Sequence, residues 1–180
     1  MEKTISVWVA ADTGESLSAI RAQAIRENAA LGLSEFSLSL PQHISLKISF
    51  PLPESRFEEA VERITALLSG KGGFSVRIRG VERNGNILWI AMEQEKALCD
   101  LHCMLDEAME KEFGVTPHPF DQCYQFHSTL FMDENEEKLQ EMALRLRDFP
   151  LPFAIPIHRF LIGCSREEEP GVYRVIRQFA

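Results

Sequence analysis

The chain has 180 residues, which suits a single domain with a sizeable core. Its 45% hydrophobic and 26% charged residues are ordinary for a globular protein, and no apolar run approaches the roughly 18 residues of a membrane span. The net charge of −8 argues against tight, sequence-independent binding of long nucleic acid, although one nucleotide or RNA end could still find a locally basic site. We expect a cytoplasmic monomer, since no signal peptide is evident and the four cysteines suit a reducing compartment.

Hydrophobic periodicity predicts strands and helices that alternate along the chain. In chain order we expect a strand at 4–10, a helix at 13–30, a strand at 44–50, a helix at 54–69, strands at 74–79 and 87–92, a helix at 95–113, a strand at 126–132, a helix at 134–147, an extended segment at 150–162 and a strand at 172–179.

Local signals set the limits of several of these elements. Thr13 is placed to cap the first helix and Gly32 to end it, while Pro51 and Pro53 are expected to close the second strand. Asn84-Gly85 is a strong hairpin signal, so the strands on either side of it should form an antiparallel pair.

The order of elements nearly repeats in the second half of the chain. This predicts an α+β fold built from a duplicated, pseudo-twofold unit, with antiparallel sheets flanked by helices around a central groove. We expect one domain over residues 1–180 with two lobes, roughly 1–92 and 93–180, between which strands can exchange.

Two short segments share the same sequence pattern, one in each half of the chain. His43-Ile44-Ser45-Leu46 and His127-Ser128-Thr129-Leu130 each place a histidine two residues before a hydroxyl side chain, within a predicted strand. Alternate residues of a strand share a face, so each imidazole should lie beside a hydroxyl. Either histidine alone would be read as an ordinary strand residue; the recurrence favours a shared site with two acid–base groups and two hydrogen-bonding arms.

The strand alternation assigns other residues to these two faces. Lys47 should share the groove face with His43, where it would either add a positive charge beside a phosphate or lie solvated at the groove edge. Tyr124, Phe126 and Phe131 could stack on a base, but only Phe131 should share the face of His127; core packing is the alternative for all three.

The remaining histidines, His102, His118 and His158, lack the pattern and are expected to be structural or exposed. Cys99, His102 and Cys103 lie close together on a predicted helix, yet nothing completes a four-ligand zinc site, so we favour ordinary helix cysteines and expect no metal and no cofactor.

The two motifs resemble the signature motifs of the 2H phosphoesterase superfamily, and the chain is most similar to the RNA 2′,3′-cyclic phosphodiesterases, or 2′-5′ RNA ligase-like proteins. The resemblance extends over nearly the whole chain, with Ser45 where the family more often has threonine. It implies a bilobal fold in which His127 is the proton acceptor for the attacking water, His43 is the proton donor to the leaving oxygen, and Ser45 and Thr129 bind the phosphate.

The chemistry agrees with the residue types. Hydrolysis of a cyclic phosphodiester needs a base and an acid. Near pH 7 one of two histidines can be neutral while the other is protonated. We therefore expect a metal-independent phosphodiesterase acting on the 2′,3′-cyclic phosphate of an RNA end or on a related small nucleotide diester. The alternatives are cleavage of 2′,5′-linked oligonucleotides or RNA ligation at the same site, or a protein that only binds a nucleotide or RNA end.

Overall fold

The structure is a computed structural model that describes residues 2–180, apart from the side chain of Gln122. Its α-helices are α1 (Gly14–Leu31), α2 (Phe57–Leu68), α3 (Lys96–Phe113) and α4 (Glu136–Leu146). Its strands are β1 (Thr4–Asp12), β2 (His43–Pro53), β3 (Phe74–Asn84), β4 (Ile87–Met92), β5 (His127–Met132), β6 (Ala154–Ile157), β7 (Phe160–Arg166) and β8 (Arg174–Phe179). Short 3-10 turns cover Phe36–Ser39, Glu54–Arg56 and Asp121–Cys123.

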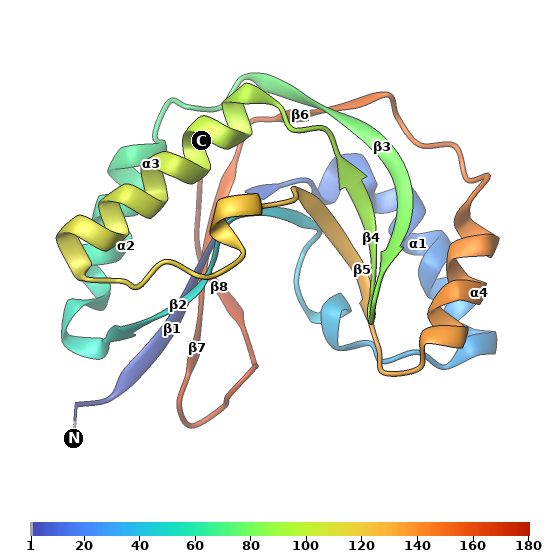
Figure 1. Cartoon of the computed structure of the whole chain (residues 1–180), viewed down its shortest axis with the longest axis horizontal. Coiled ribbons are helices and arrows are strands. Elements are labelled where there is room, and N and C mark those ends of the chain that lie inside the picture. Colours follow the sequence, from blue (N-terminus) through green and yellow to red (C-terminus); the bar gives the residue numbers. More distant parts are fainter. Residues whose placement is uncertain (1) are drawn as a thin grey trace.

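The strands form two four-stranded antiparallel sheets, in the orders β2-β1-β7-β8 and β5-β4-β3-β6. Figure 1 shows α2 and α3 outside the first sheet and α1 and α4 outside the second. This is the predicted α+β class with curled antiparallel sheets flanked by helices. β2 and β5, which carry the two histidine motifs, are edge strands of different sheets and contact each other.

Each lobe takes elements from both halves of the chain. The first sheet combines β1 and β2 with β7 and β8, while α1, which follows β1, packs against α4 beside the second sheet. The lobes therefore do not divide the chain near residue 92, and β7 and β8 have crossed to the sheet of the N-terminal strands.

The two faces of β1 explain how the sheets pack. Val7, Val9 and Ala11 lie in the main hydrophobic core, which continues through both lobes, while Trp8 and Ala10 form a small separate cluster on the opposite face. A strand with apolar residues on both faces reads as a continuous apolar run, and this is how the segment appears in the sequence.

Two local predictions were wrong. The Thr13 side chain makes no capping hydrogen bond, although Gly32 ends α1 in the left-handed conformation as expected. The second strand does not end at Pro51, because β2 continues to Pro53, the other proline that was expected to close it. A proline lacks the N–H that a ladder needs, and an edge strand tolerates this because one of its sides has no partner.

A β-bulge follows the hydroxyl residue in each histidine motif. In β2, Ala10 pairs with Ser45 and Val9 with Lys47, which leaves Leu46 as the extra residue. In β5, Trp89 pairs with Thr129 and Leu88 with Phe131, which leaves the second motif's leucine as the extra residue. A bulge shifts the alternation by one residue, so the side chains beyond it exchange faces.

These bulges overturn two predictions about faces. Lys47 points toward α3 instead of the groove, and Ile48 takes its place on the cavity side. Phe131 is fully buried in the core, and Met132 lies on the cavity side instead. Lys47 is therefore not positioned to contact a phosphate, and Phe131 cannot stack on a base.

Candidate active site

The two motif histidines are the first residues of their strands, and their side chains are held in the same way. The Nδ1–H of His43 donates to the carbonyl of Pro41 at 2.8 Å, and the Nδ1–H of His127 donates to the carbonyl of Gln125 at 2.7 Å. In both cases the acceptor lies two residues earlier. This bond fixes the tautomer and leaves Nε2 free for proton transfer.

Each imidazole also rests on a tryptophan from the neighbouring strand. His43 packs against Trp8 of β1 with ring centroids 4.8 Å apart, and His127 stacks on Trp89 of β4 at 4.2 Å. A ring that is hydrogen-bonded at one nitrogen and packed on one face has little rotational freedom. The two catalytic candidates thus occupy matching supports, as a duplicated unit would give.

The hydroxyl of each motif lines the same cavity as the histidine of the other motif. His127 and Ser45 line one cavity of about 470 Å³, which we call the larger cavity. His43 and Thr129 line a second cavity of about 150 Å³, the smaller cavity. All four predicted site residues therefore lie where β2 and β5 meet.

Burial lowers the pKa of both imidazoles below the usual value of a histidine. For His43, the hydrogen bond to Pro41 and the Asp12 carboxylate act against this shift, while the charges of His127 and Arg21 add to it. For His127, only the hydrogen bond to Gln125 opposes burial. Since a charge on one imidazole disfavours a charge on the other, the pair is suited to sharing one proton.

The larger cavity has an aromatic and hydroxyl-rich wall. Tyr124 borders Ser45, and burial raises the pKa of its phenol well above the ordinary range, with the Ser45 hydroxyl offsetting part of the effect. The phenol is therefore a neutral hydrogen-bonding group. Phe120 also lines this cavity and is 70% exposed. Phe126 is buried in the core, which was the alternative to stacking on a base.

Lys47 belongs to a buried ion cluster behind β2. Its ammonium lies 2.5 Å from a carboxylate oxygen of Asp106 on α3 and 2.8 Å from one of Asp121. His102 joins them: its Nε2 lies 3.3 Å from the Asp106 carboxylate, and its Nδ1–H donates to the Leu46 carbonyl at 2.8 Å.

Residues of this ion cluster are also possible metal ligands. His102, Asp106 and Asp121 are the one group within the described residues whose ligand atoms lie close enough together to hold an ion. The Lys47 ammonium already supplies the positive charge between the two carboxylates, so these residues fit an ion pair better than a metal site. Cys99 and Cys103 are not part of this group.

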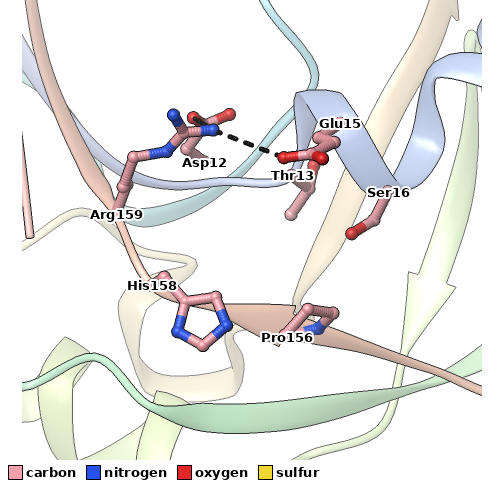
Figure 2. A pocket seen from close by; sticks show the side chains of 7 residues that line it. All are labelled: Asp12, Thr13, Glu15, Ser16, Pro156, His158 and Arg159. Atoms are coloured by element: carbon pink, nitrogen blue, oxygen red, sulfur yellow. Dashed lines mark ion pairs between the residues drawn. The ribbon is translucent and has the colours of Figure 1, made fainter.

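A third cavity, of about 410 Å³, lies at the start of α1 (Figure 2). Arg159 Nη2 lies 3.3 Å from the Asp12 carboxylate and 3.9 Å from that of Glu15, so its charge is already balanced. His158 lines this cavity, away from the motif histidines, and His118 lies in a loop beside Phe120. Neither shares the arrangement of His43 and His127, as the sequence predicted.

Residues 7–162 match the family model of the 2′-5′ RNA ligase superfamily. The chain belongs to the 2′-5′ RNA ligase superfamily. This family, whose members are 2H phosphoesterases, is the one that the two His-x-hydroxyl motifs resemble.

Solved structures share the fold of this superfamily member at low sequence identity. The chain is similar to Escherichia coli LigT complexed with 3′-AMP, at 16% identity and a TM-score of 0.55, covering 98% of this chain and 97% of LigT. LigT complexed with phosphate gives the same identity and TM-score, with coverage of 100% and 98%. TT0787 of Thermus thermophilus gives 16% identity and a TM-score of 0.62, with coverage of 97% and 96%. No curated protein sequence matches the chain.

Several side chains at the site of this superfamily member were missed by sequence reasoning. Trp8 and Trp89 sit within apolar runs that read simply as core strands, and Phe120 lies in a proline-containing loop. Gln42 was missed although it directly precedes His43, because nothing in the strand pattern indicates that its side chain crosses to β5.

Among residues 2–180, no helix combines the length and the apolar character needed to cross a bilayer.

Proposed function

We propose that the protein is a metal-independent phosphodiesterase that hydrolyses the 2′,3′-cyclic phosphate of an RNA end or a related small nucleotide diester. Its membership of a superfamily acting on phosphodiester bonds supports the reaction type. The observation that carries the proposal is the crossed arrangement, in which each cavity joins the histidine of one motif to the hydroxyl of the other.

In this mechanism His127 accepts a proton from the attacking water and His43 donates one to the departing ribose oxygen. Burial lowers the pKa of His43, and the hydrogen bond to Pro41 and the Asp12 carboxylate oppose part of this shift. Ser45 and Thr129 hydrogen-bond the non-bridging phosphate oxygens, where charge develops in the transition state. Each positioned acid or base contributes a factor of roughly 10²–10⁴ to the rate.

The substrate class follows from the two unequal cavities. The larger cavity, with Phe120 at its exposed edge, has room for a nucleoside and an aromatic surface for its base. Structures of LigT with 3′-AMP and with phosphate support ligands of this chemistry in a protein of the same fold. We infer a small nucleotide or a single RNA end rather than a long nucleic acid, in agreement with the net charge of −8.

We also propose an oligomeric state and a location for the protein. We infer a monomer that works without a membrane or cofactor. The four cysteines are unpaired, which suits the reducing cytoplasm.

The test compares two substrates with different leaving groups. Replacing either histidine, as His43→Ala or His127→Ala, should lower kcat for a nucleoside 2′,3′-cyclic phosphate by about 10²–10⁴-fold. On a p-nitrophenyl phosphodiester, whose leaving group needs no acid, only His43→Ala should recover much of its activity, since its lost role is then dispensable.

Several outcomes would contradict the proposal or change its substrate. Parent-level activity of the double variant would remove the two-histidine mechanism, and recovery of His127→Ala instead of His43→Ala would reverse the roles. Binding of 3′-AMP without any turnover of cyclic phosphates or 2′,5′-linked dinucleotides would favour a binding protein. Cleavage of the 2′,5′ linkage alone, or ligation of RNA ends, would change the substrate.

A further inference from the structure

The separation of the two histidines is not set by either sheet. His43 and His127 lie on β2 and β5, which are edge strands of different sheets and share no ladder of backbone hydrogen bonds. Their relative position must therefore come from contacts between the lobes. Proton transfer at both ends of one phosphate requires this position to be accurate, because a misplacement of about 1 Å can cost roughly 10²-fold in rate.

Gln42 joins the two motifs at positions next to the histidines in the chain. Its side-chain Nε2–H donates to the carbonyl of Thr129 at 3.0 Å, and its Oε1 accepts a hydrogen bond from the Ser128 hydroxyl at 2.7 Å. Gln42 directly precedes His43, and Ser128 directly follows His127. A single amide therefore spans from the start of one motif to the middle of the other.

The hydrogen bonds of the Gln42 amide are shielded from water. Gln42 is 2% exposed and Ser128 is fully buried, so water cannot easily replace either partner. The backbone carbonyl of Gln42 also accepts a hydrogen bond from the Thr13 N–H at 3.0 Å, which ties the residue to the end of β1. Another contact between these segments, from the Ser37 hydroxyl to the carbonyl of Leu130 at 3.0 Å, joins residues that are further along the chain from His43 and His127.

We propose that Gln42 is a positioning residue that fixes the placement of His43 relative to His127. The inference rests on the proposed function, which requires both imidazoles to transfer protons at the same phosphate group. Gln42 touches neither substrate nor proton in this role. It acts through the two strands that carry the catalytic pair.

The test replaces Gln42 by leucine, which keeps the size of the side chain but removes both hydrogen bonds. A matched control is Asn28→Leu. Asn28 is also a buried amide with two hydrogen bonds, donating to the Leu33 carbonyl at 3.1 Å and accepting from the Leu33 N–H at 2.7 Å, but it lies on α1 away from the site.

Both variants should lose thermal stability to a similar extent, and only Gln42→Leu should lose activity. We expect its kcat for a cyclic nucleotide to fall by about 10–100-fold, with KM changing far less, because the phosphate-binding hydroxyls remain. Asn28→Leu should keep the parent kcat at a temperature where it is folded.

Two further measurements keep the proposal open to refutation. Ser128→Ala removes only one of the two hydrogen bonds, so it serves if Gln42→Leu fails to fold, and it should show a smaller fall in kcat. Titration of the imidazoles by NMR reports their coupling without turnover: the two histidines should titrate interdependently in the parent and more independently in Gln42→Leu or Ser128→Ala.

These readouts separate the two proposals. An unchanged kcat in Ser128→Ala and in folded Gln42→Leu, or coupling that persists in both, would overturn the positioning role. A parent that hydrolyses no phosphodiester would overturn the proposed function alone, and the NMR titration would still decide whether Gln42 sets the distance between the imidazoles.

Discussion

At the scale of single residues, a glycine underlies the support of one catalytic candidate. Gly163 of β7 pairs with Trp8 of β1, and a Cβ added at Gly163 would lie 2.2 Å from Trp8 Nε1. The indole therefore lies close over the glycine backbone, and it also packs against the His43 ring. The orientation of the His43 imidazole on β2 therefore depends on the lack of a Cβ at Gly163 on β7, two strands away.

We predict that Gly163→Ala will displace Trp8 and with it His43, lowering kcat by about 10-fold or more, since orientation errors of this size are costly. Steady-state kinetics with a cyclic nucleotide measure the loss. The double variant Gly163→Ala/Trp8→Phe should regain activity, because the smaller ring leaves room for the added methyl group. Full activity of Gly163→Ala would show that the packing can adjust without cost.

At the scale of secondary-structure elements, the β-bulges decide which residues face the cavities. In both motif strands a bulge comes one residue after the hydroxyl, at Leu46 and at Leu130, and β2 has a further register shift between Lys47 and Phe50. The bulge in β2 turns Lys47 inward, where α3 supplies Asp106 as its partner. The helix and the bulged strand are thus joined by an ion pair, and the site itself is left to hydroxyl and imidazole groups.

The ion cluster gives a prediction that separates a structural lysine from a phosphate-binding one. Lys47→Met leaves the Asp106 and Asp121 carboxylates without their cation, so it should lower the free energy of unfolding by about 3–5 kcal/mol, the usual cost of breaking a buried pair. Urea denaturation measures this. Adding Asp106→Asn and Asp121→Asn should recover much of the stability.

A phosphate-binding role for Lys47 predicts different kinetics. Variants of Lys47 would then raise KM strongly while leaving the free energy of unfolding nearly unchanged. The side chain is 2% exposed and points toward α3, so we expect the loss of stability instead.

At the scale of the whole molecule, the fold couples the protonation of its site to its stability. Burial lowers the pKa of both His43 and His127 in the folded protein, while an unfolded chain returns each to about 6.5. Between the two values the unfolded state binds more protons, so stability rises with pH. The contribution of the two imidazoles is complete above about pH 6.5 and is lost as the pH falls through the lowered values.

We therefore predict that the free energy of unfolding falls between pH 7 and pH 5. A variant with both histidines changed to glutamine should show a weaker decline, because glutamine does not titrate. Denaturation curves across this interval test the difference between the two proteins. Equal slopes would indicate that the imidazoles are not desolvated in the folded state.

The sequence by itself determined the class of fold, the order of elements and the candidate pairs of His43 with Ser45 and His127 with Thr129. These are local properties: alternation of apolar residues reports a strand, and glycine at residue 32 ends a helix because it adopts the left-handed conformation. Two similar triplets, each on a predicted strand, were enough to indicate a shared site.

Only the tertiary structure decided the surroundings of that site. The faces of Lys47 and Phe131 depend on bulges, which arise from register with a neighbouring strand rather than from the residues of the strand itself. The supports from Trp8 and Trp89, and the bridge from Gln42, join residues far apart in the chain. Periodicity describes one strand at a time, and a site built where two sheets meet depends on how the edges of those sheets approach.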